Sequence, residues 1–477
     1  MAVGFANRVR WSLVVLASVL WSGGSAPGAG PGPDVNALLA DHALKYPKSV
    51  VGLSIVDLRD GTRLAAHNDT RPCTPASNLK VFTSIFALTA LGGEATFTTT
   101  AWLDGDDLYV TGQFDPTLGD SHLAEADGTS VYAELDRWAQ ALKAATDGKG
   151  VRRLLLACSA PGAGYRHEDW PAAQQEAWYE APVAALNFQN NCIDVSFQVA
   201  GGARQTTVSP AGQFFRVIDQ TRAGAKTEWR LKLSDNDATM TLTGTVSRSS
   251  TEPRAVPVND PPLFFGRVLA DRLVRAGMPA PASLAVVAPV DKPASAKAVA
   301  TTVTPLATVM ARANKRSLNM AAECMLLRAG DGTWAGSIRT MESVLTATYH
   351  LPSGCLTLRD GSGLSKLDRV TPAAMTTLLA GGLARKDAKV FVDSLPRAGI
   401  DGTLEHRFKD KKTKGAVGRV LAKTGYINNT HALSGYVADK QGALCVAFSI
   451  LSNGTNAGAR DLEDGITAAL VKWLDMK

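Results

Sequence analysis

The chain has 477 residues, of which 45% are hydrophobic and 20% are charged, a composition typical of folded globular proteins and not of disordered or fibrous ones. Its formal net charge of +6 is spread along the chain without a long basic run, which argues against nucleic acid as a partner. The length leaves room for roughly three domains of ~150 residues.

The N-terminal residues are typical of an export signal. Arg8 and Arg10 precede the apolar run from Trp11 to Trp21, and small residues follow it, so we predict a signal peptide over residues 1–26. This run is shorter than the ~20 apolar residues that span a bilayer, although a retained anchor is the alternative. We expect an exported protein of the periplasm or cell envelope, with no stable membrane span after signal cleavage.

The two ends of the chain carry similar patterns. Residues 49–68 predict two strands joined by a turn at Arg59-Asp60-Gly61, and residues 431–454 predict a second hairpin that turns at 439–442. A helix is expected over 461–474. These elements indicate one mixed domain assembled from both ends, residues 34–97 and 297–477.

The middle of the chain has a different pattern. Residues 98–296 are rich in short alternating runs, with helical stretches at 131–145 and 264–277. An insertion of this length cannot be a surface loop of a compact domain. It therefore predicts a β-rich inserted region of one or two domains, including a further small domain near 200–256.

One lysine stands out in the stretch "TPASNLKVFTSIFALTALGG" (74–93). From Val81 onward it is apolar on nearly every face, which predicts a buried helix, yet Lys80 lies near the helix start, where the dipole disfavours a cation. Residues i and i+3 share a helix face, so Ser77 is expected beside Lys80. Burial lowers a lysine pKa toward that of a general base, which activates serine as a nucleophile. The alternative is an N-capping serine followed by a lysine that reaches water.

Two further motifs follow in chain order. Lys423-Thr424-Gly425 offers a lysine and a hydroxyl that can bind a carboxylate, and a glycine that permits close backbone approach. Ser317-Leu318-Asn319 lies between two helical runs within 305–330, where a tight connection can direct a hydroxyl and an amide into a cleft. A literal Ser234-Asp235-Asn236 also occurs, but its polar, strand-rich surroundings indicate a turn without function.

Together these motifs resemble those of the class C low-molecular-mass penicillin-binding proteins, the D-alanyl-D-alanine carboxypeptidase/endopeptidase family. The resemblance extends over nearly the whole chain after the expected signal peptide and includes four longer stretches: "FDPTLGD" (114–120), "APVAALNFQNNCIDV" (181–195), "DGSGLSKLDRVTP" (360–372) and "LPRAGIDGTLEHRF" (395–408). It implies an α+β fold, in which a β-lactamase/transpeptidase-like domain with an antiparallel sheet flanked by helices carries the inserted region.

The resemblance also implies an activity. The expected enzyme is a serine-type D-Ala-D-Ala carboxypeptidase or endopeptidase that acts on peptidoglycan stem peptides through an acyl-enzyme. β-Lactams are expected to acylate it, and no metal or cofactor is implied. In this scheme Ser77 attacks the carbonyl carbon and Lys80 accepts its proton, while Ser317 relays a proton to the leaving amine beside Lys423.

Residues of the second and third motifs are expected to hold the substrate. By the same resemblance, Asn319 binds the substrate backbone and Thr424 binds the terminal carboxylate. Gly425 allows the substrate strand to lie close, and the backbone N–H groups of Ser77 and Tyr426 form the oxyanion hole.

The chain departs from the family pattern at two positions. Tyr426 stands where a small hydroxyl residue is common, and Leu318 replaces a common aspartate. Tyr426 leaves open a non-catalytic peptidoglycan-binding homologue, and a β-lactamase or esterase of the same fold is a further alternative. A Ser-His-Asp hydrolase is a weaker alternative, because the sequence contains no Gly-x-Ser-x-Gly motif. The stretch from Asp360 to Gly363 is interpreted as a turn.

Six cysteines occur at positions 73, 158, 192, 324, 355 and 445. An exported protein can pair them, but the spacing selects none of the possible connectivities. No two are spaced as Cys-x-x-Cys, so a zinc site is not expected.

Overall fold

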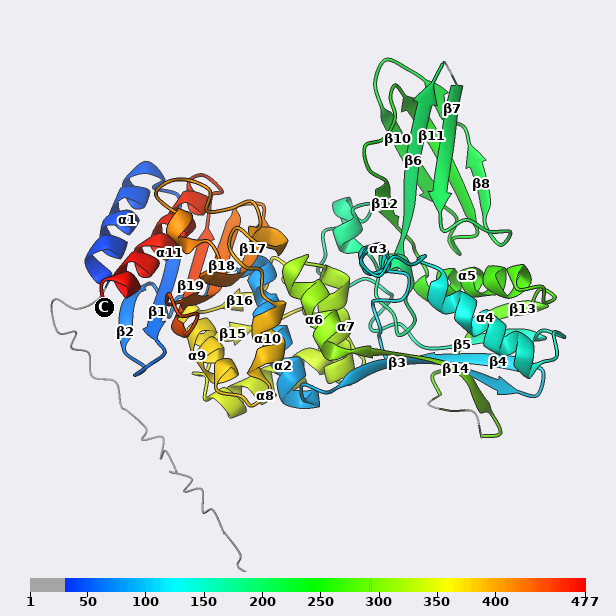
Figure 1. Cartoon of the computed structure of the whole chain (residues 1–477), viewed down its shortest axis with the longest axis horizontal. Helices are drawn as coiled ribbons and strands as arrows, with labels where there is room; N and C mark the ends of the chain where they lie inside the picture. Colours follow the sequence, from blue (N-terminus) through cyan, green and yellow to red (C-terminus); the bar gives the residue numbers. More distant parts are fainter. Residues whose placement is uncertain (1–30, 202, 291, 293) are drawn as a thin grey trace, which may run out of the picture.

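The computed structural model describes residues 31–201, 203–290, 292 and 294–477. The predicted signal peptide, residues 1–26, lies outside this range. Within it, none of the helices combines the length and the apolar character needed to cross a bilayer. Figure 1 shows a part built from both chain ends on one side, an inserted part on the other, and a β-rich arm that projects from the inserted part.

The part built from the chain ends contains a five-stranded antiparallel sheet in the order β17-β18-β19-β1-β2. Its strands are β1 (Val50–Asp57), β2 (Arg63–His67), β17 (Val420–Ile427), β18 (Thr430–Ala438) and β19 (Leu444–Asn453). β1 pairs with β19 along its whole length, so strands from opposite ends of the chain are neighbours. Both predicted hairpins are confirmed.

Two terminal helices cover one face of this sheet. α1 (Gly32–Lys45) and α11 (Ala459–Asp475) pack on each other and on the strands. Val35 of α1 and Ile466 of α11 belong to one buried cluster with Leu53 of β1. The apolar sides of both helices therefore face the sheet, and their polar sides face water. The predicted C-terminal helix is confirmed.

Helices from three parts of the sequence cover the other face. They are α2 (Leu79–Leu91), α6 (Leu306–Lys315), α7 (Asn319–Ala329), α8 (Trp334–Tyr349), α9 (Pro372–Leu383) and α10 (Ala388–Ser394). α2 is central, and every residue from Leu79 to Leu88 is buried, as its all-round apolar pattern predicts. A short pair, β15 (Leu356–Thr357) with β16 (Arg369–Val370), lies beside these helices.

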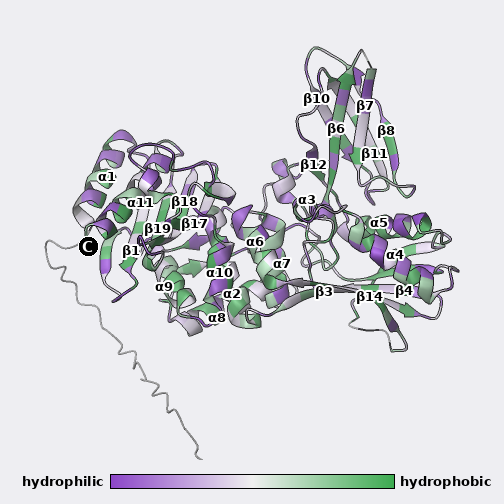
Figure 2. Cartoon of the chain, viewed as in Figure 1, coloured by the Kyte–Doolittle hydropathy of each residue, from purple (hydrophilic) through white to green (hydrophobic). Residues whose placement is uncertain are grey.

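The inserted part begins and ends on adjacent strands. β3 (Thr96–Asp104) pairs antiparallel with β14 (Lys297–Pro305) in a sheet of order β13-β5-β4-β3-β14. The other members are β4 (Asp107–Gly112), β5 (Arg153–Ala157) and β13 (Ser283–Val287), with helices α3 (Ser121–Ala126), α4 (Ala133–Ala145) and α5 (Pro261–Arg275). Figure 2 shows hydrophilic and hydrophobic residues alternating along α4 and α5, the amphipathic pattern of helices that pack on a sheet.

The arm consists of two small sheets. One has the order β12-β6-β7 and the other β10-β11-β8, with β9 also paired to β11. Their bounds are β6 (Cys192–Ala200), β7 (Ala203–Ser209), β8 (Arg216–Asp219), β9 (Arg222–Ala223), β10 (Glu228–Leu233), β11 (Thr239–Val246) and β12 (Arg254–Pro257). Short 3-10 turns η1 to η6 lie at Ala76–Asn78, Ala172–Gln174, Trp178–Glu180, Gln189–Asn191, Gly402–Leu404 and Lys414–Ala416.

The exact domain limits stay a prediction. Because β14 belongs to the inserted sheet, we propose that the inserted part begins near residue 96, where β3 starts, and ends near residue 305, where β14 ends. The sequence predicted these domain boundaries at 97/98 and 296/297. We likewise propose that the arm, whose strands run from Cys192 to Pro257, is the further small domain predicted near 200–256.

Candidate active site

Ser77 lies in the 3-10 turn η1 that leads directly into α2. Ala76, the residue before it, has a left-handed backbone (φ 47°), an unfavourable conformation for a residue with a Cβ. Gly363 packs directly against the carbonyl of Ala76, where a side chain would clash, and this contact helps to hold the turn. Ser77 forms no side-chain cap on η1 or α2, so the N-cap alternative is excluded.

The Lys80 amine is fully buried and does not reach solvent. Its Nζ donates to Ser77 Oγ at 2.8 Å, to Asn319 Oδ1 at 2.6 Å and to the carbonyl oxygen of Ser362 at 2.8 Å. Burial lowers the pKa of Lys80 to about 7, although the acidic Asp360 and Glu323 act in the opposite direction. A neutral amine still supplies two N–H donors for Asn319 and Ser362, and its lone pair then faces the Ser77 hydroxyl. This arrangement can accept the proton of Ser77.

A second lysine–serine pair lies on neighbouring elements. Ser317, in the connection between α6 and α7, has a left-handed backbone (φ 56°), and its Oγ accepts from Lys423 Nζ at 2.9 Å. Lys423 is also fully buried, and burial together with the nearby Lys80 lowers its pKa well below the ordinary value. The site therefore holds two amine–hydroxyl pairs, each able to pass a proton.

The edge strand β17 lies against the turn that carries Ser77. The amide of Asn78, fully buried, donates to the carbonyl oxygen of Lys423 at 2.9 Å. A Cβ on Gly425 would come within 2.8 Å of the Pro75 carbonyl oxygen and 3.0 Å of Asn78 Nδ2. Glycine at 425 is thus required for β17 to lie this close to η1.

Alternate residues of β17 direct their backbone groups away from β18. The N–H of Ala422 donates to the Pro396 carbonyl at 3.0 Å, and the Thr424 carbonyl accepts from Lys423 Nζ at 2.8 Å. The same alternation places the backbone N–H of Tyr426 at the open edge of the sheet, beside η1. This position suits an oxyanion-hole donor.

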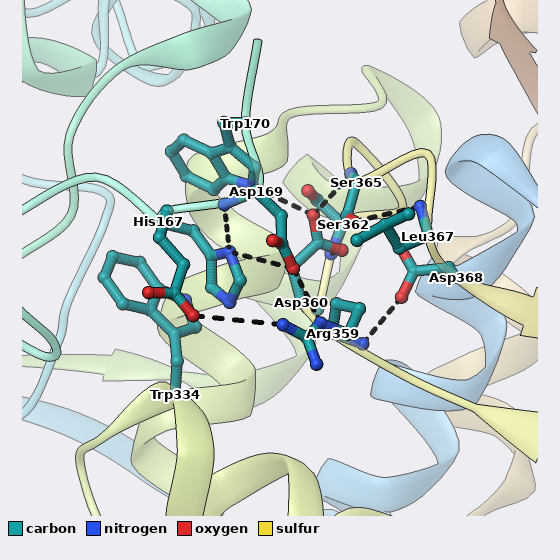
Figure 3. A network of polar contacts seen from close by, with 12 residues as sticks. His167, Asp169, Trp170, Trp334, Arg359, Asp360, Ser362, Ser365, Leu367 and Asp368 are labelled. Atoms are coloured by element: carbon teal, nitrogen blue, oxygen red, sulfur yellow. Dashed lines mark hydrogen bonds and ion pairs between the residues drawn. The ribbon is translucent and has the colours of Figure 1, made fainter. Parts of the chain in front are cut away.

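A loop of residues 359–368 supports Lys80 from behind, and Figure 3 shows its polar contacts. Asp360 is fully buried and accepts backbone N–H groups of Ser362, Gly363 and Ser365 at 3.1, 2.7 and 2.8 Å. Glu323 of α7 accepts the Gly361 N–H at 3.0 Å, and burial raises its pKa to about 8. These carboxyl groups fix the loop whose Ser362 carbonyl oxygen accepts a hydrogen bond from Lys80 Nζ.

The inserted part completes this network. Trp170 donates its indole N–H to Asp360 at 2.9 Å, and Asp169 accepts a hydrogen bond from Arg359 Nε at 2.6 Å (Figure 3). The amide of Asn319 donates to the Tyr179 carbonyl at 2.8 Å. Residues of the inserted part therefore contact both the Lys80-supporting loop and one of the Lys80 acceptors.

The rejected motif and the cysteines lie apart from this constellation. Ser234 and Asn236 bond to each other and to neighbouring backbone in the turn between β10 and β11, as predicted. All six cysteines fall within the described residues, where they are buried and unpaired. Across those residues, no group of three or more His, Cys, Asp or Glu side chains is placed to hold a metal ion.

Sequence reasoning missed several residues of the site. Asp360 to Gly363 does form a turn, as interpreted, but that turn also holds Lys80 through the Ser362 carbonyl. Asn78 and Glu323 were also missed. Asp360 lies in one of the longer family-like stretches, which was the signal available for it.

Comparisons with known proteins identify the family of this chain. Residues 33–477 match the D-Ala-D-Ala carboxypeptidase 3 (S13) family. A D-alanyl-D-alanine carboxypeptidase from Actinomadura sp. (strain R39) is 27% identical over 476 residues, covering 92% of this chain and 84% of the relative. The D-alanyl-D-alanine carboxypeptidase DacB of Haemophilus influenzae is 24% identical over 451 residues and covers 90% of each chain.

The fold is matched by a solved structure as well. The crystal structure of penicillin binding protein 4 (dacB) from Haemophilus influenzae aligns with a TM-score of 0.73 at 21% identity, over 91% of this chain and 98% of that one. The predicted α+β fold is therefore confirmed. Since the family match extends over nearly the whole chain, the protein belongs to the D-Ala-D-Ala carboxypeptidase 3 (S13) family and is a serine-type D-alanyl-D-alanine carboxypeptidase.

Proposed function

We propose that Ser77 is the nucleophile of this carboxypeptidase and that Lys80 is its general base. One observation carries the proposal: Ser77 Oγ lies 2.8 Å from a fully buried amine whose pKa is about 7. The neutral amine takes the hydroxyl proton while the oxygen attacks the carbonyl carbon between two D-alanines. Asn319 and the Ser362 carbonyl hold the amine in place during this step.

The remaining motif residues serve the later steps. The backbone N–H groups of Ser77 and Tyr426 stabilise the negative charge on the carbonyl oxygen as the tetrahedral intermediate forms. Ser317, hydrogen-bonded to Lys423, passes a proton to the departing amine of the terminal D-alanine, and the C–N bond breaks. Water then attacks the ester on Ser77, which releases the shortened peptide and restores the hydroxyl group.

Peptidoglycan stem peptides ending in D-Ala-D-Ala are the proposed substrates, with β-lactams as acylating inhibitors. Two observations support this: the family to which the chain belongs is named for D-Ala-D-Ala, and the similar Haemophilus influenzae protein has been solved in complex with a β-lactam. The expected signal peptide over residues 1–26 suits a substrate that lies outside the cytoplasmic membrane. We therefore propose the periplasm or cell envelope as the site of action.

Mass spectrometry with benzylpenicillin tests the nucleophile and the activity together. We expect one penicilloyl adduct on the peptide that contains Ser77, release of D-alanine from an acylated L-Lys-D-Ala-D-Ala peptide, and neither with Ser77→Ala. Undiminished acylation of Ser77→Ala would refute the assignment. An adduct without D-alanine release would favour the peptidoglycan-binding homologue, and rapid hydrolysis of penicillin without peptide cleavage would favour a β-lactamase.

A further inference from the structure

The residue after the Lys-Thr-Gly motif cannot supply the hydroxyl that the family resemblance leads us to expect near the carboxylate site. Tyr426 is 63% exposed, and its ring packs edge-on against His431 at a centroid distance of 5.0 Å. The Tyr426 hydroxyl lies next to Asn456, at 3.5 Å from its Nδ2. Position 426 thus leaves Thr424 without a second donor from its own strand.

Another threonine provides a hydroxyl beside Thr424. The Oγ1 atoms of Thr424 and Thr403 lie 2.8 Å apart, although the two residues are separated by 21 positions in the chain. Thr403 is exposed and belongs to the short turn η5, so its hydroxyl is accessible to a ligand. Two hydroxyls at this spacing can each donate to one oxygen of the same carboxylate.

The position of Thr403 is fixed by its neighbours in the turn. Gly402 has φ 61°, and a Cβ there would come within 2.8 Å of the Lys315 carbonyl oxygen. Leu404 is fully buried in the core beneath the sheet. Asp401 pairs with Lys315 and accepts the Arg397 N–H at 2.9 Å, which joins the turn to the end of α6.

The same segment runs along the open edge of β17. The Ala398 N–H donates to the Val420 carbonyl at 2.9 Å, and the Ala422 N–H donates to the Pro396 carbonyl at 3.0 Å. This places η5 between the Ser317 connection and the Lys-Thr-Gly strand. Thr403 is therefore held by both elements that carry the second and third motifs.

We propose that Thr403 is a binding residue that, together with Thr424, holds the free C-terminal carboxylate of the acyl-donor peptide. The inference rests on the proposed function and adds a specificity residue to it. In the free enzyme the two hydroxyls bond to each other. When the carboxylate enters, each rotates to donate to one of its oxygens, and no bond other than hydrogen bonds changes.

Paired substrates with and without the terminal charge test the proposal. The probes are an acylated L-Lys-D-Ala-D-Ala peptide and its C-terminal carboxamide, with kcat and KM measured for release of the last residue. A hydrogen bond to a charged group is strong, so Thr403→Val is expected to lower kcat/KM for the free acid by about ten- to a hundredfold. The carboxamide is expected to change by less than about threefold, and Thr403→Ser to restore most of the loss.

The control is Thr62→Val, an exposed threonine in the β1–β2 turn at the opposite edge of the sheet. If Thr403→Val lowers kcat/KM equally for the acid and the carboxamide, or for neither, the proposal is overturned. In that case turnover by the wild type still supports the proposed function. If the wild type itself releases no D-alanine and forms no penicilloyl adduct, the proposed function fails first. A thermal melt of each variant shows that the fold is intact, and Thr403→Ala provides a second truncation if the valine variant melts early.

Discussion

Lys80 is an unusual residue in a helix that is apolar on all sides. A buried ammonium group loses its hydration, so the protein favours the neutral amine and the pKa falls to about 7. The three polar neighbours of Nζ satisfy an amine in either form, which lets the proton move without leaving an unpaired group. Burial and hydrogen bonding together therefore make Lys80 usable as a base near neutral pH.

The rate of acylation should follow the protonation of Lys80. Below its pKa the amine is protonated and cannot accept the Ser77 proton, whereas above it the amine is neutral and can. We expect the second-order rate of benzylpenicillin acylation to rise with pH through about 7 and then level off. Stopped-flow or quench measurements between about pH 5.5 and about pH 9 check this, since the penicillin carboxylate stays ionised throughout. A profile flat across this range would contradict the assignment of Lys80.

Replacement of Asn319 by aspartate should move that profile. The side-chain oxygen lies 2.6 Å from Lys80 Nζ, so Asn319→Asp places a negative charge against the amine and raises the Lys80 pKa by about 1–3 units. Acylation at pH 7 should fall at least about tenfold and recover at higher pH. Asn319→Ala is the matched control, because it also removes the bond to Tyr179 but adds no charge. An inflection unchanged in Asn319→Asp would show that this contact does not set the pKa.

At the scale of elements, the site depends on how closely β17 lies against η1. Gly425→Ala inserts a Cβ within 2.8 Å of the Pro75 carbonyl oxygen, which must push the strand away and weaken the Asn78 bond to Lys423. A displacement of this kind is expected to slow acylation by about a hundredfold. Gly415→Ala is the control, because its Cβ would meet only Val471 at 3.8 Å. Acylation rates and melting temperatures of both variants give the measurement, and equal rates would refute the requirement for close approach.

Elements with a regular hydrophobic pattern could be predicted from the sequence. The hairpins of β1–β2 and β18–β19, the helix α2 and the turn at Ser234 to Asn236 all follow from local residue patterns. The contacts that finish the site could not be predicted in this way. Lys80 reaches Ser362 across 282 positions, and Thr424 reaches Thr403 only because both segments line one sheet edge. Such contacts depend on tertiary packing, which leaves no periodic signal in the chain.

At the scale of the whole molecule, the inserted part does more than extend the surface. Its segment 167–170 makes two aromatic contacts and an ion pair with the part built from the chain ends, and the Trp170 and Trp334 ring centroids lie 5.8 Å apart. Trp170 supplies one of the N–H groups that surround the buried Asp360 (Figure 3). The inserted part therefore helps to fix the loop that holds Lys80.

A double-mutant cycle tests this long-range support. Trp170→Phe removes the N–H donor to Asp360 but keeps an aromatic ring, so it should slow benzylpenicillin acylation by about five- to fiftyfold, because a buried charge loses a partner. In the Asp360→Asn background the same substitution should cost much less, since the charge that it served is already gone. Trp229→Phe, on β10 of the arm, should leave the rate unchanged in both backgrounds. Fully additive losses from Trp170→Phe and Asp360→Asn would mean that the inserted part stabilises the fold without acting on Lys80 through Asp360.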